Sequence, residues 1–194
     1  MVGVRLTNGN NEILLANRNG RAVRFDENDV RTMGRVSTGV IGMRLDGGDD
    51  EVVGMVCVND PQTETIMVVS ENGYGKRSEV EDYRKTARGA KGVKTLAVTE
   101  KTGRLVAIKV VTDENDLMII NKSGILIRLK VADVRVMGRA TQGVRLINLT
   151  KKNDTIASVC KVMSNQDEDI EEAEVVNEEL PEGDAPLMDF TGEE

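Results

Sequence analysis

The pattern Asp-x-Arg-x-x-x-Arg-x-x-x-Gly-Val occurs three times in this chain of 194 residues. Its copies begin at Asp29, Asp82 and Asp133, and their closing glycines, at positions 39, 92 and 143, lie 53 and 51 residues apart. A period near 50 is typical of solenoids and propellers, in which each repeat is one small structural unit. Units of this size bury too little surface to fold alone, so neighbouring repeats must pack against each other.

Each copy of the pattern follows a signal for a β-hairpin. An apolar segment leads into a two-residue turn that ends in glycine, and a second segment carries an arginine four residues after that glycine. The turns are Asn19-Gly20, Asn72-Gly73 and Ser123-Gly124. Asparagine tolerates positive φ and glycine adopts it freely, so these pairs favour a type I′ turn.

The repeats run over residues 11–58, 64–111 and 115–162, and each contains four apolar segments of strand length. Four strands per unit predict the blade of a propeller, and the fold class is therefore all-β. Residues 1–7 resemble the last strand of each repeat, which predicts that the chain opens on the last strand of a truncated blade. The blades together occupy residues 1–162.

Residues 163–194 form an acidic tail with a different composition. They contain 13 of the chain's 33 Asp and Glu residues and none of its 26 Lys and Arg residues. Because apolar residues are sparse, we expect the tail to be disordered. The remaining 26 basic and 20 acidic residues give the repeat body a charge of about +6. A basic body predicts a polyanionic partner, and the acidic tail is expected to compete with that partner.

The sequence also indicates in which cellular compartment the protein is found. Cys57 and Cys160 lie at matching places in apolar strands, where buried free thiols are expected rather than a disulfide. The first residues do not have the basic start and apolar core of a signal peptide, and no apolar run approaches the roughly 20 residues of a membrane span. We therefore expect a cytoplasmic protein without a membrane partner.

The chain contains no histidine, which removes the commonest general base and most zinc sites. Residues 73–78 superficially resemble a phosphate-binding loop, but the required spacing is absent and the hairpin occupies the same place. The sequence thus predicts neither a catalytic centre nor a metal site.

The recurring arginines are the candidate functional residues. Repeats bring equivalent loops onto one rim, where their charges can form a continuous band, and small residues between them let a DNA backbone approach. An alternative is that single arginines pair with the recurrent aspartates or bind loop carbonyls and hold the blades together. The candidate DNA-binding residues are Arg24, Arg31, Arg35, Arg77, Arg84, Lys85, Arg88, Lys91, Arg128, Arg135, Arg139 and Arg145.

With these motifs, residues 1–162 resemble the C-terminal domain of DNA gyrase A subunits. The resemblance rests on Asn-Gly-x-x-x-Arg at 19–24 and 72–77, on Val-Arg-x-Met-Gly-Arg at 30–35 and 134–139, and on Gln142-Gly143-Val144. The family's box Gln-Arg-Arg-Gly-Gly-x-Gly is absent, and its nearest echo is residues 87–92. The tail also resembles the acidic extension of the family.

The resemblance implies a β-pinwheel around which double-stranded DNA is wrapped, in support of ATP-dependent negative supercoiling. The implied partners are DNA, the rest of the gyrase A subunit, and the gyrase B subunit. No cofactor is expected in this chain, whereas the holoenzyme is expected to use ATP and Mg. Two alternatives stay open: the corresponding domain of a topoisomerase IV A subunit, and a protein-interaction β-propeller.

Overall fold

Each of the three repeats forms an antiparallel hairpin, a single turn of 3-10 helix and a later long strand. The computed structural model describes residues 1–149 and 154–164. In chain order the elements are β1 (Glu12–Asn17), β2 (Arg21–Asp26), η1 (Glu27–Asp29), β3 (Val52–Val58), β4 (Thr65–Ser70), β5 (Tyr74–Glu79), η2 (Val80–Asp82), β6 (Val93–Lys94), β7 (Leu105–Val111), β8 (Asn115–Asn121), β9 (Leu126–Lys130), η3 (Val131–Asp133), β10 (Val144–Arg145) and β11 (Ile156–Met163).

The hairpins form where the sequence predicts them, but their turns differ from the expected type. The amide of Gly20 donates to the carbonyl of Asn17, which makes the glycine the fourth residue of the turn rather than its third. Gly73 and Gly124 donate in the same way to Ser70 and Asn121. All three glycines have φ between 77° and 85°. Positive φ is therefore needed just after the turn, as in longer hairpin loops that end in a glycine bulge.

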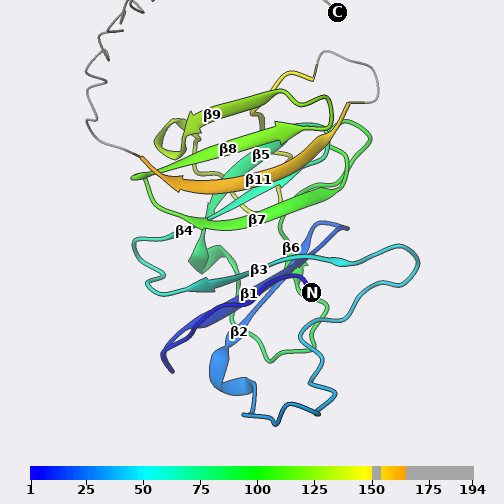
Figure 1. Cartoon of the computed structure of the whole chain (residues 1–194), viewed down its shortest axis with the longest axis vertical. Helices are drawn as coiled ribbons and strands as arrows, with labels where there is room; N and C mark the ends of the chain where they lie inside the picture. Colours follow the sequence, from blue (N-terminus) through cyan, green and yellow to red (C-terminus); the bar gives the residue numbers. More distant parts are fainter. Residues whose placement is uncertain (150–153, 165–194) are drawn as a thin grey trace, which may run out of the picture. The chain divides into compact units, whose positions relative to one another are not determined.

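Neighbouring repeats exchange a strand. The sheets have the orders β3-β1-β2-β6, β10-β5-β4-β7 and β11-β8-β9 (Figure 1). The short strand β6 belongs to the second repeat but pairs with β2 of the first, and β10 of the third repeat pairs with β5 of the second. The predicted all-β architecture of three propeller-like repeats is confirmed. The fourth strand of the first two sheets, however, comes from the next repeat along the chain.

The two ends of the repeat body differ from the sequence expectation. Residues 1–7 form no strand, because no neighbouring strand among the described residues pairs with them, and Leu6 is fully exposed. At the other end β11 extends to Met163, so this residue belongs to the last blade. Residues 165–194 lie outside the described residues, and the predicted disorder and competition of the tail stay predictions.

Two apolar clusters join the repeats face to face. We call the side of a sheet toward the earlier repeat its preceding face and the opposite side its following face. Between the first and second repeats, Leu14 and Ala16 of β1 pack in one cluster with Ile66 and Val68 of β4. Between the second and third repeats, the alternate residues of β4 share a second cluster with β8: Met67, Val69, Leu117 and Ile119. Because successive side chains of β4 point to opposite faces of its sheet, this strand contributes to both junctions.

The two cysteines lie on opposite faces. Cys57 is half-buried against a third cluster, on the preceding face of the first repeat. Cys160 is exposed, and it pairs with Met118, whose neighbours Leu117 and Ile119 point to the preceding face. Cross-strand partners share a face, so Cys160 lies on the following face of the third repeat. The expectation of matching, buried thiols was wrong, although both cysteines are free.

Candidate nucleic-acid interface

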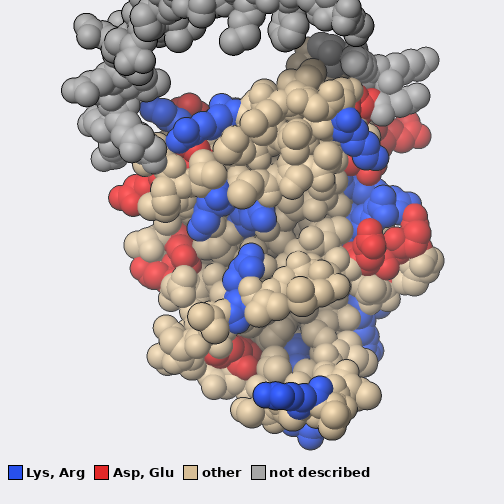
Figure 2. Space-filling view, viewed as in Figure 1, with Lys and Arg blue, Asp and Glu red and all other residues tan. Residues whose placement is uncertain are grey.

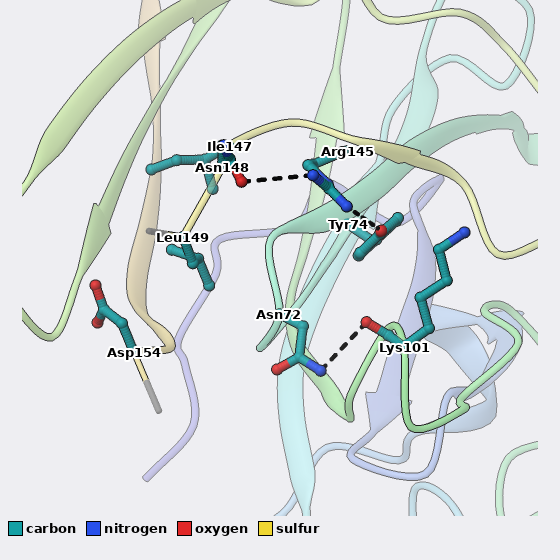
Figure 3. A pocket seen from close by; sticks show the side chains of 8 residues that line it. All are labelled: Asn72, Tyr74, Lys101, Arg145, Ile147, Asn148, Leu149 and Asp154. Carbon is teal, nitrogen blue, oxygen red and sulfur yellow. Dashed lines mark hydrogen bonds between the residues drawn. The ribbon is translucent and has the colours of Figure 1, made fainter. Parts of the chain in front are cut away.

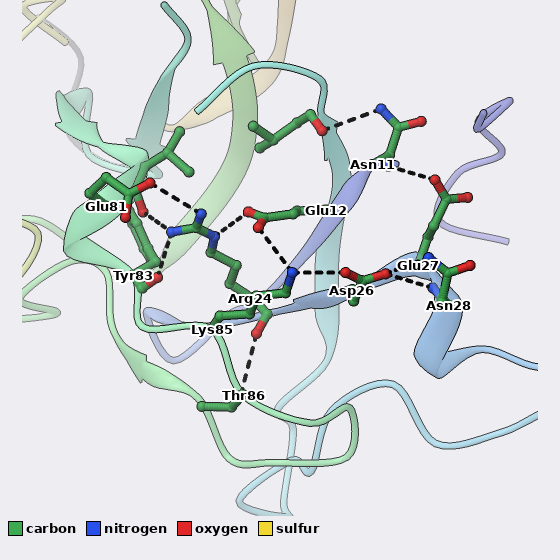
Figure 4. Close-up of polar contacts among 12 residues, drawn as sticks. Asn11, Glu12, Arg24, Asp26, Glu27, Asn28, Glu81, Tyr83, Lys85 and Thr86 are labelled. Atoms are coloured by element: carbon green, nitrogen blue, oxygen red, sulfur yellow. Dashed lines mark hydrogen bonds and ion pairs between the residues drawn. The ribbon is translucent and has the colours of Figure 1, made fainter. Parts of the chain in front are cut away.

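The first arginine of the motif joins one repeat to the next. Arg24 of β2 is only 5% exposed, and its guanidinium donates to the carbonyls of Val80 (2.9 Å) and Tyr83 (3.0 Å) in the second repeat (Figure 4). Its Nε also donates to the Glu12 carboxylate at 2.5 Å. Because a buried charge is tolerated only when it is paired and hydrogen-bonded, these contacts occupy Arg24 fully.

Arg77 plays the same part between the second and third repeats. It is 6% exposed and donates to the Val131 carbonyl (3.1 Å), to Thr65 (3.1 Å) and to the Asp113 carboxylate (2.6 Å). Arg128 has the equivalent position in the third repeat, but its side chain is 50% exposed, and its one partner within the described part of the chain is Asp116. Arg24 and Arg77 are thus buried at the junctions between repeats, which disfavours their interpretation as DNA contacts and favours a structural role.

The third arginine of the motif reaches back to the earlier repeat. Arg88 donates to the carbonyls of Asp29 (3.0 Å) and Ile41 (3.2 Å). Arg139 repeats this arrangement one blade later, with the carbonyls of Asp82 (2.9 Å) and Lys94 (2.8 Å) as acceptors. Both side chains are half-buried, so each retains some exposed guanidinium surface beside its structural role. Arg35 is exposed and makes no such contact among the described residues.

The second arginine of the motif points outward. Tyr83 and Val134 are buried in the two junction clusters, and both have extended backbone angles. Successive side chains of an extended chain point to opposite sides, so Arg84 and Arg135 face solvent. Arg31 is exposed at the equivalent position. Among the described residues these three guanidinium groups have no hydrogen bond or ion pair, and they are free to meet a ligand.

Two candidate lysines are partly neutralised by the protein itself. Lys85 lies 2.8 Å from Asp26 and 3.3 Å from Glu12. The hydrogen bond from Lys85 lowers the pKa of Asp26 to about 2, and the pKa of Lys85 is raised by the same bond. Lys91 pairs with Asp46 at 3.0 Å and lowers the pKa of that carboxyl. Both lysines remain exposed, but their local field is weakened by the carboxylates.

Arg145 belongs to a separate cationic pocket of about 310 Å³ (Figure 3). Its guanidinium lies 5.6 Å from the centre of the Tyr74 ring and donates to the Tyr74 hydroxyl at 3.0 Å. Lys101 lies 5.4 Å from the same ring centre. Sequence reasoning missed Lys101, because it lies in a Thr-Glu-Lys-Thr turn outside the repeated pattern and carries no signal of its own.

Lys76, a lysine next to the motif, is buried and lies inside the fold. Its Nζ donates to the carbonyl of Gly138 at 2.7 Å and so ties the loop of the third repeat to β5. Burial lowers the pKa of Lys76 to about 8, although the nearby Asp82 opposes the shift. Lys76 therefore contributes to the junction rather than to the charged surface.

The charges do not form one unbroken band on the face drawn in Figure 2. Blue patches of Lys and Arg are separated there by neutral surface, and red patches of Asp and Glu lie mainly toward the two sides. Two acidic residues neutralise candidate lysines: Asp26 pairs with Lys85, and Asp46 pairs with Lys91. The described structure thus favours several separate cationic points, which repeat from blade to blade.

The family model described as "DNA gyrase C-terminal domain, beta-propeller" matches this chain three times, at residues 11–59, 64–112 and 115–160. The chain belongs to this family. A curated relative, the A subunit of DNA gyrase from Staphylococcus aureus (strain MRSA252), is 43% identical over 195 residues. That match covers 93% of this chain and 22% of the relative, so the chain spans about a fifth of the relative's length.

The fold of this chain resembles solved structures from two kinds of topoisomerase. The crystal structure of the C-terminal domain of DNA topoisomerase IV has a TM-score of 0.77 and 28% identity, over 84% of this chain and 50% of that one. The structure of a DNA gyrase A C-terminal domain has a TM-score of 0.71 and 28% identity, over 79% and 51%. The predicted family is confirmed, and its fold is common to both topoisomerase types.

Two further observations concern metal-binding sites and membrane-spanning helices. Among residues 1–149 and 154–164, no group of three or more Cys, Asp or Glu side chains is placed to hold a metal ion. In the same part of the chain no helix is long and apolar enough to cross a membrane.

Proposed function

We propose that this chain binds double-stranded DNA through its phosphates, without sequence preference, and serves as a wrapping surface. The single observation that carries the proposal is the triplet Arg31, Arg84 and Arg135, which are exposed at the same position of every repeat and have no partner among residues 1–149 and 154–164. A guanidinium on a surface without base-reading neighbours contacts phosphate, which fixes position but not sequence. Arg35, Lys91, Arg145 and Lys101 would add weaker or separate contacts.

Wrapping places a further demand on the interface. Bending a site of 20–30 base pairs costs about 1 to 6 kcal/mol, which several phosphate contacts along the path must offset. One free arginine in each repeat supplies such a series. In the holoenzyme the chain would act with the rest of a gyrase A subunit, together with a gyrase B subunit. ATP and Mg would be used outside this chain, which would itself contain no catalytic centre.

The cytoplasmic location expected from the sequence is part of this proposal, and it is supported by the bacterial source of the relative. A topoisomerase IV A subunit is the second candidate parent, because the topoisomerase IV domain matches this fold with a TM-score of 0.77. Grafting the chain in place of the corresponding domain of each enzyme would separate them, since a gyrase domain should restore negative supercoiling.

The DNA proposal is tested by fluorescence anisotropy with a random-sequence duplex over a range of salt concentrations. Each phosphate neutralised contributes about −0.9 to the slope of log K against log salt. Replacing Arg31, Arg84 and Arg135 by alanine should therefore reduce the slope by about 2.7. The matched control removes three arginines outside the motif, Arg5, Arg18 and Arg104, and should change it less. Equal slopes for the two variants, or no DNA binding by the intact chain, would refute the proposal.

A further inference from the structure

The pocket around Tyr74 lies between the second and third repeats (Figure 3). Asn72, Tyr74 and Lys101 of the second repeat form one wall, and Arg145 and Asn148 of the third repeat belong to the other. Because both of these repeats are described, the pocket is not a repeat face that lacks its neighbour. Its volume of about 310 Å³ is at the lower end of the range for small-ligand sites.

The Tyr74 ring holds two cationic side chains in place. Tyr74 begins β5 and is only 7% exposed. The guanidinium carbon of Arg145 lies 5.6 Å from the ring centre, and the Nζ of Lys101 lies 5.4 Å from it. Arg145 also donates to the Tyr74 hydroxyl at 3.0 Å. A ring attracts cations to its face, and a buried ring fixes their positions before a ligand binds, which lowers the entropic cost of binding.

These two cations have no carboxylate partner in the described part of the chain. Asp154 is the one acidic residue that lines this part of the pocket. Its carboxylate is already engaged, because Oδ2 accepts a hydrogen bond from the Asn121 amide at 2.7 Å and Oδ1 accepts one from the backbone amide of Thr155 at 2.9 Å. Two positive charges that share one pocket attract an anion to it.

At the junction of the first and second repeats, the protein supplies its own anion. Arg21 occupies the position of Tyr74 there, as the first residue of β2. The turn before β3, residues 46–50, contains three aspartates. One of them, Asp46, pairs with Arg21 at 3.5 Å and with Lys91 at 3.0 Å. The cations of this junction are therefore neutralised from within the chain.

At the junction of the second and third repeats, the equivalent turn has the opposite charge. Residues 99–103 carry a threonine at the position of Asp46, and Lys101 stands where the first repeat has a glycine. Glu100, the one acidic residue of this turn, does not line the pocket. The internal anion of the first junction is thus replaced by a further cation, and the pocket is suited to an anion from outside the chain.

We propose that this pocket binds a doubly charged phosphate group, in inorganic phosphate or a small phosphomonoester. The guanidinium of Arg145 has planar donors that match phosphate oxygens, and Lys101 adds a second positive charge. A phosphomonoester carries a charge of about −1.5 to −2 at pH 7, so it neutralises both cations, whereas each phosphodiester of a DNA backbone carries a single charge. The charge of the ligand therefore favours a small phosphate compound over the DNA backbone.

This site goes beyond the proposed function, which gives Arg145 and Lys101 only weak or separate contacts with DNA. None of the triplet Arg31, Arg84 and Arg135 lines the pocket. Phosphate binding can therefore be measured without DNA, and either proposal can fail while the other holds.

Isothermal titration calorimetry of the full chain with inorganic phosphate, at low salt and without DNA, tests the site. We expect saturable binding of one phosphate per chain. Arg145→Gln and Lys101→Gln should each weaken it by about tenfold or more, because each substitution removes a charged donor. Lys94→Gln is the matched control, since Lys94 is exposed at the position of Arg145 in the preceding repeat and lies outside the pocket. No saturable binding, or an equal loss in the control, would overturn the proposal.

Two further titrations distinguish the sources of the phosphate. Dimethyl phosphate has a single charge, as a DNA backbone phosphate does, and should bind at least about tenfold more weakly than inorganic phosphate. The triple variant Arg31→Ala/Arg84→Ala/Arg135→Ala should bind inorganic phosphate as the intact chain does, whatever its affinity for DNA. Equal affinities for the two phosphates would assign the pocket to the DNA backbone and contradict the proposal. Loss of phosphate binding in the triple variant would contradict it as well, by moving the site to those arginines.

Discussion

The second and third repeats carry the same arginine motif, but only the second has a described repeat on each side. Every residue of β5 except Glu79 is buried, whereas β9 alternates between exposed and half-buried residues. The same difference separates Arg77, which is buried against the next repeat, from Arg128, whose side chain is half exposed. The role of a motif residue therefore depends on whether a neighbouring repeat covers it. The same sequence pattern is thus expected to contribute differently to the stability of each repeat.

The largest expected effect concerns the closing glycines. A Cβ at Gly92 would lie 2.3 Å from the Ala22 carbonyl oxygen, and the glycine has φ of 76°. Gly92→Ala should lower the free energy of unfolding by about 4 kcal/mol, since strain at positive φ adds to the displacement of a backbone. Gly39→Ala should cost only about 1 kcal/mol, because no atom lies near it. Urea denaturation measures both, and equal costs would show that the loops are equivalent.

Arg77→Ala should have the next largest effect. The substitution leaves the carbonyl of the buried Val131 and the hydroxyl of the buried Thr65 without their donor, and leaving two buried acceptors unpaired costs about 3 kcal/mol. Arg128→Ala removes a half-exposed pair and should cost about 1 kcal/mol or less. The denaturation midpoints of the two variants compare these costs. A cost at Arg128 as large as that at Arg77 would contradict the importance of the neighbouring repeat.

Lys76 predicts a pH dependence that is specific to the second junction. Its folded-state pKa of about 8 lies below the ordinary lysine value of 10.5, so the unfolded chain binds more protons between these values. Stability should therefore rise from pH 8 to pH 10, by about 2 kcal/mol. Above pH 10 the buried Tyr83, whose pKa is raised to about 12, opposes the rise.

Lys76→Met should flatten this rise, and Lys85→Met is the control. The pKa of Lys85 is raised by Asp26, so this group loses its stabilising effect as pH increases and cannot produce the rise. Chemical denaturation at pH 7, 8, 9 and 10 gives the slopes. A rise that persists in Lys76→Met would assign it to another group.

The sequence predicts the features that depend on local pattern. The repeat period, the positions of the hairpins and the number of repeats follow from the apolar segments and the turns that end in glycine. The structure confirms these three features. The exchange of β6 and β10 could not be predicted, because a strand of two residues has too little sequence pattern to define its pairing. The strand with which each one pairs lies about 70 positions earlier in the chain. The sequence left open that single arginines bind loop carbonyls, but it could not show that Arg24 is one of them or that Lys76 is buried. Charged side chains look exposed until the carbonyls that bind them are known. The position of Lys101 beside Tyr74 has no sequence signal.

The central claim is that position within the motif divides the arginines into structural and DNA-binding residues. Its most direct test is the salt dependence of DNA affinity, measured together with stability, for Arg84→Ala/Arg135→Ala and for Arg77→Ala. The account predicts that the double variant keeps its unfolding midpoint and loses about 1.8 from the slope of log K against log salt. Arg77→Ala should lose stability and keep the slope of the molecules that remain folded. An unchanged slope in the double variant, with a reduced slope in folded Arg77→Ala, would contradict the claim.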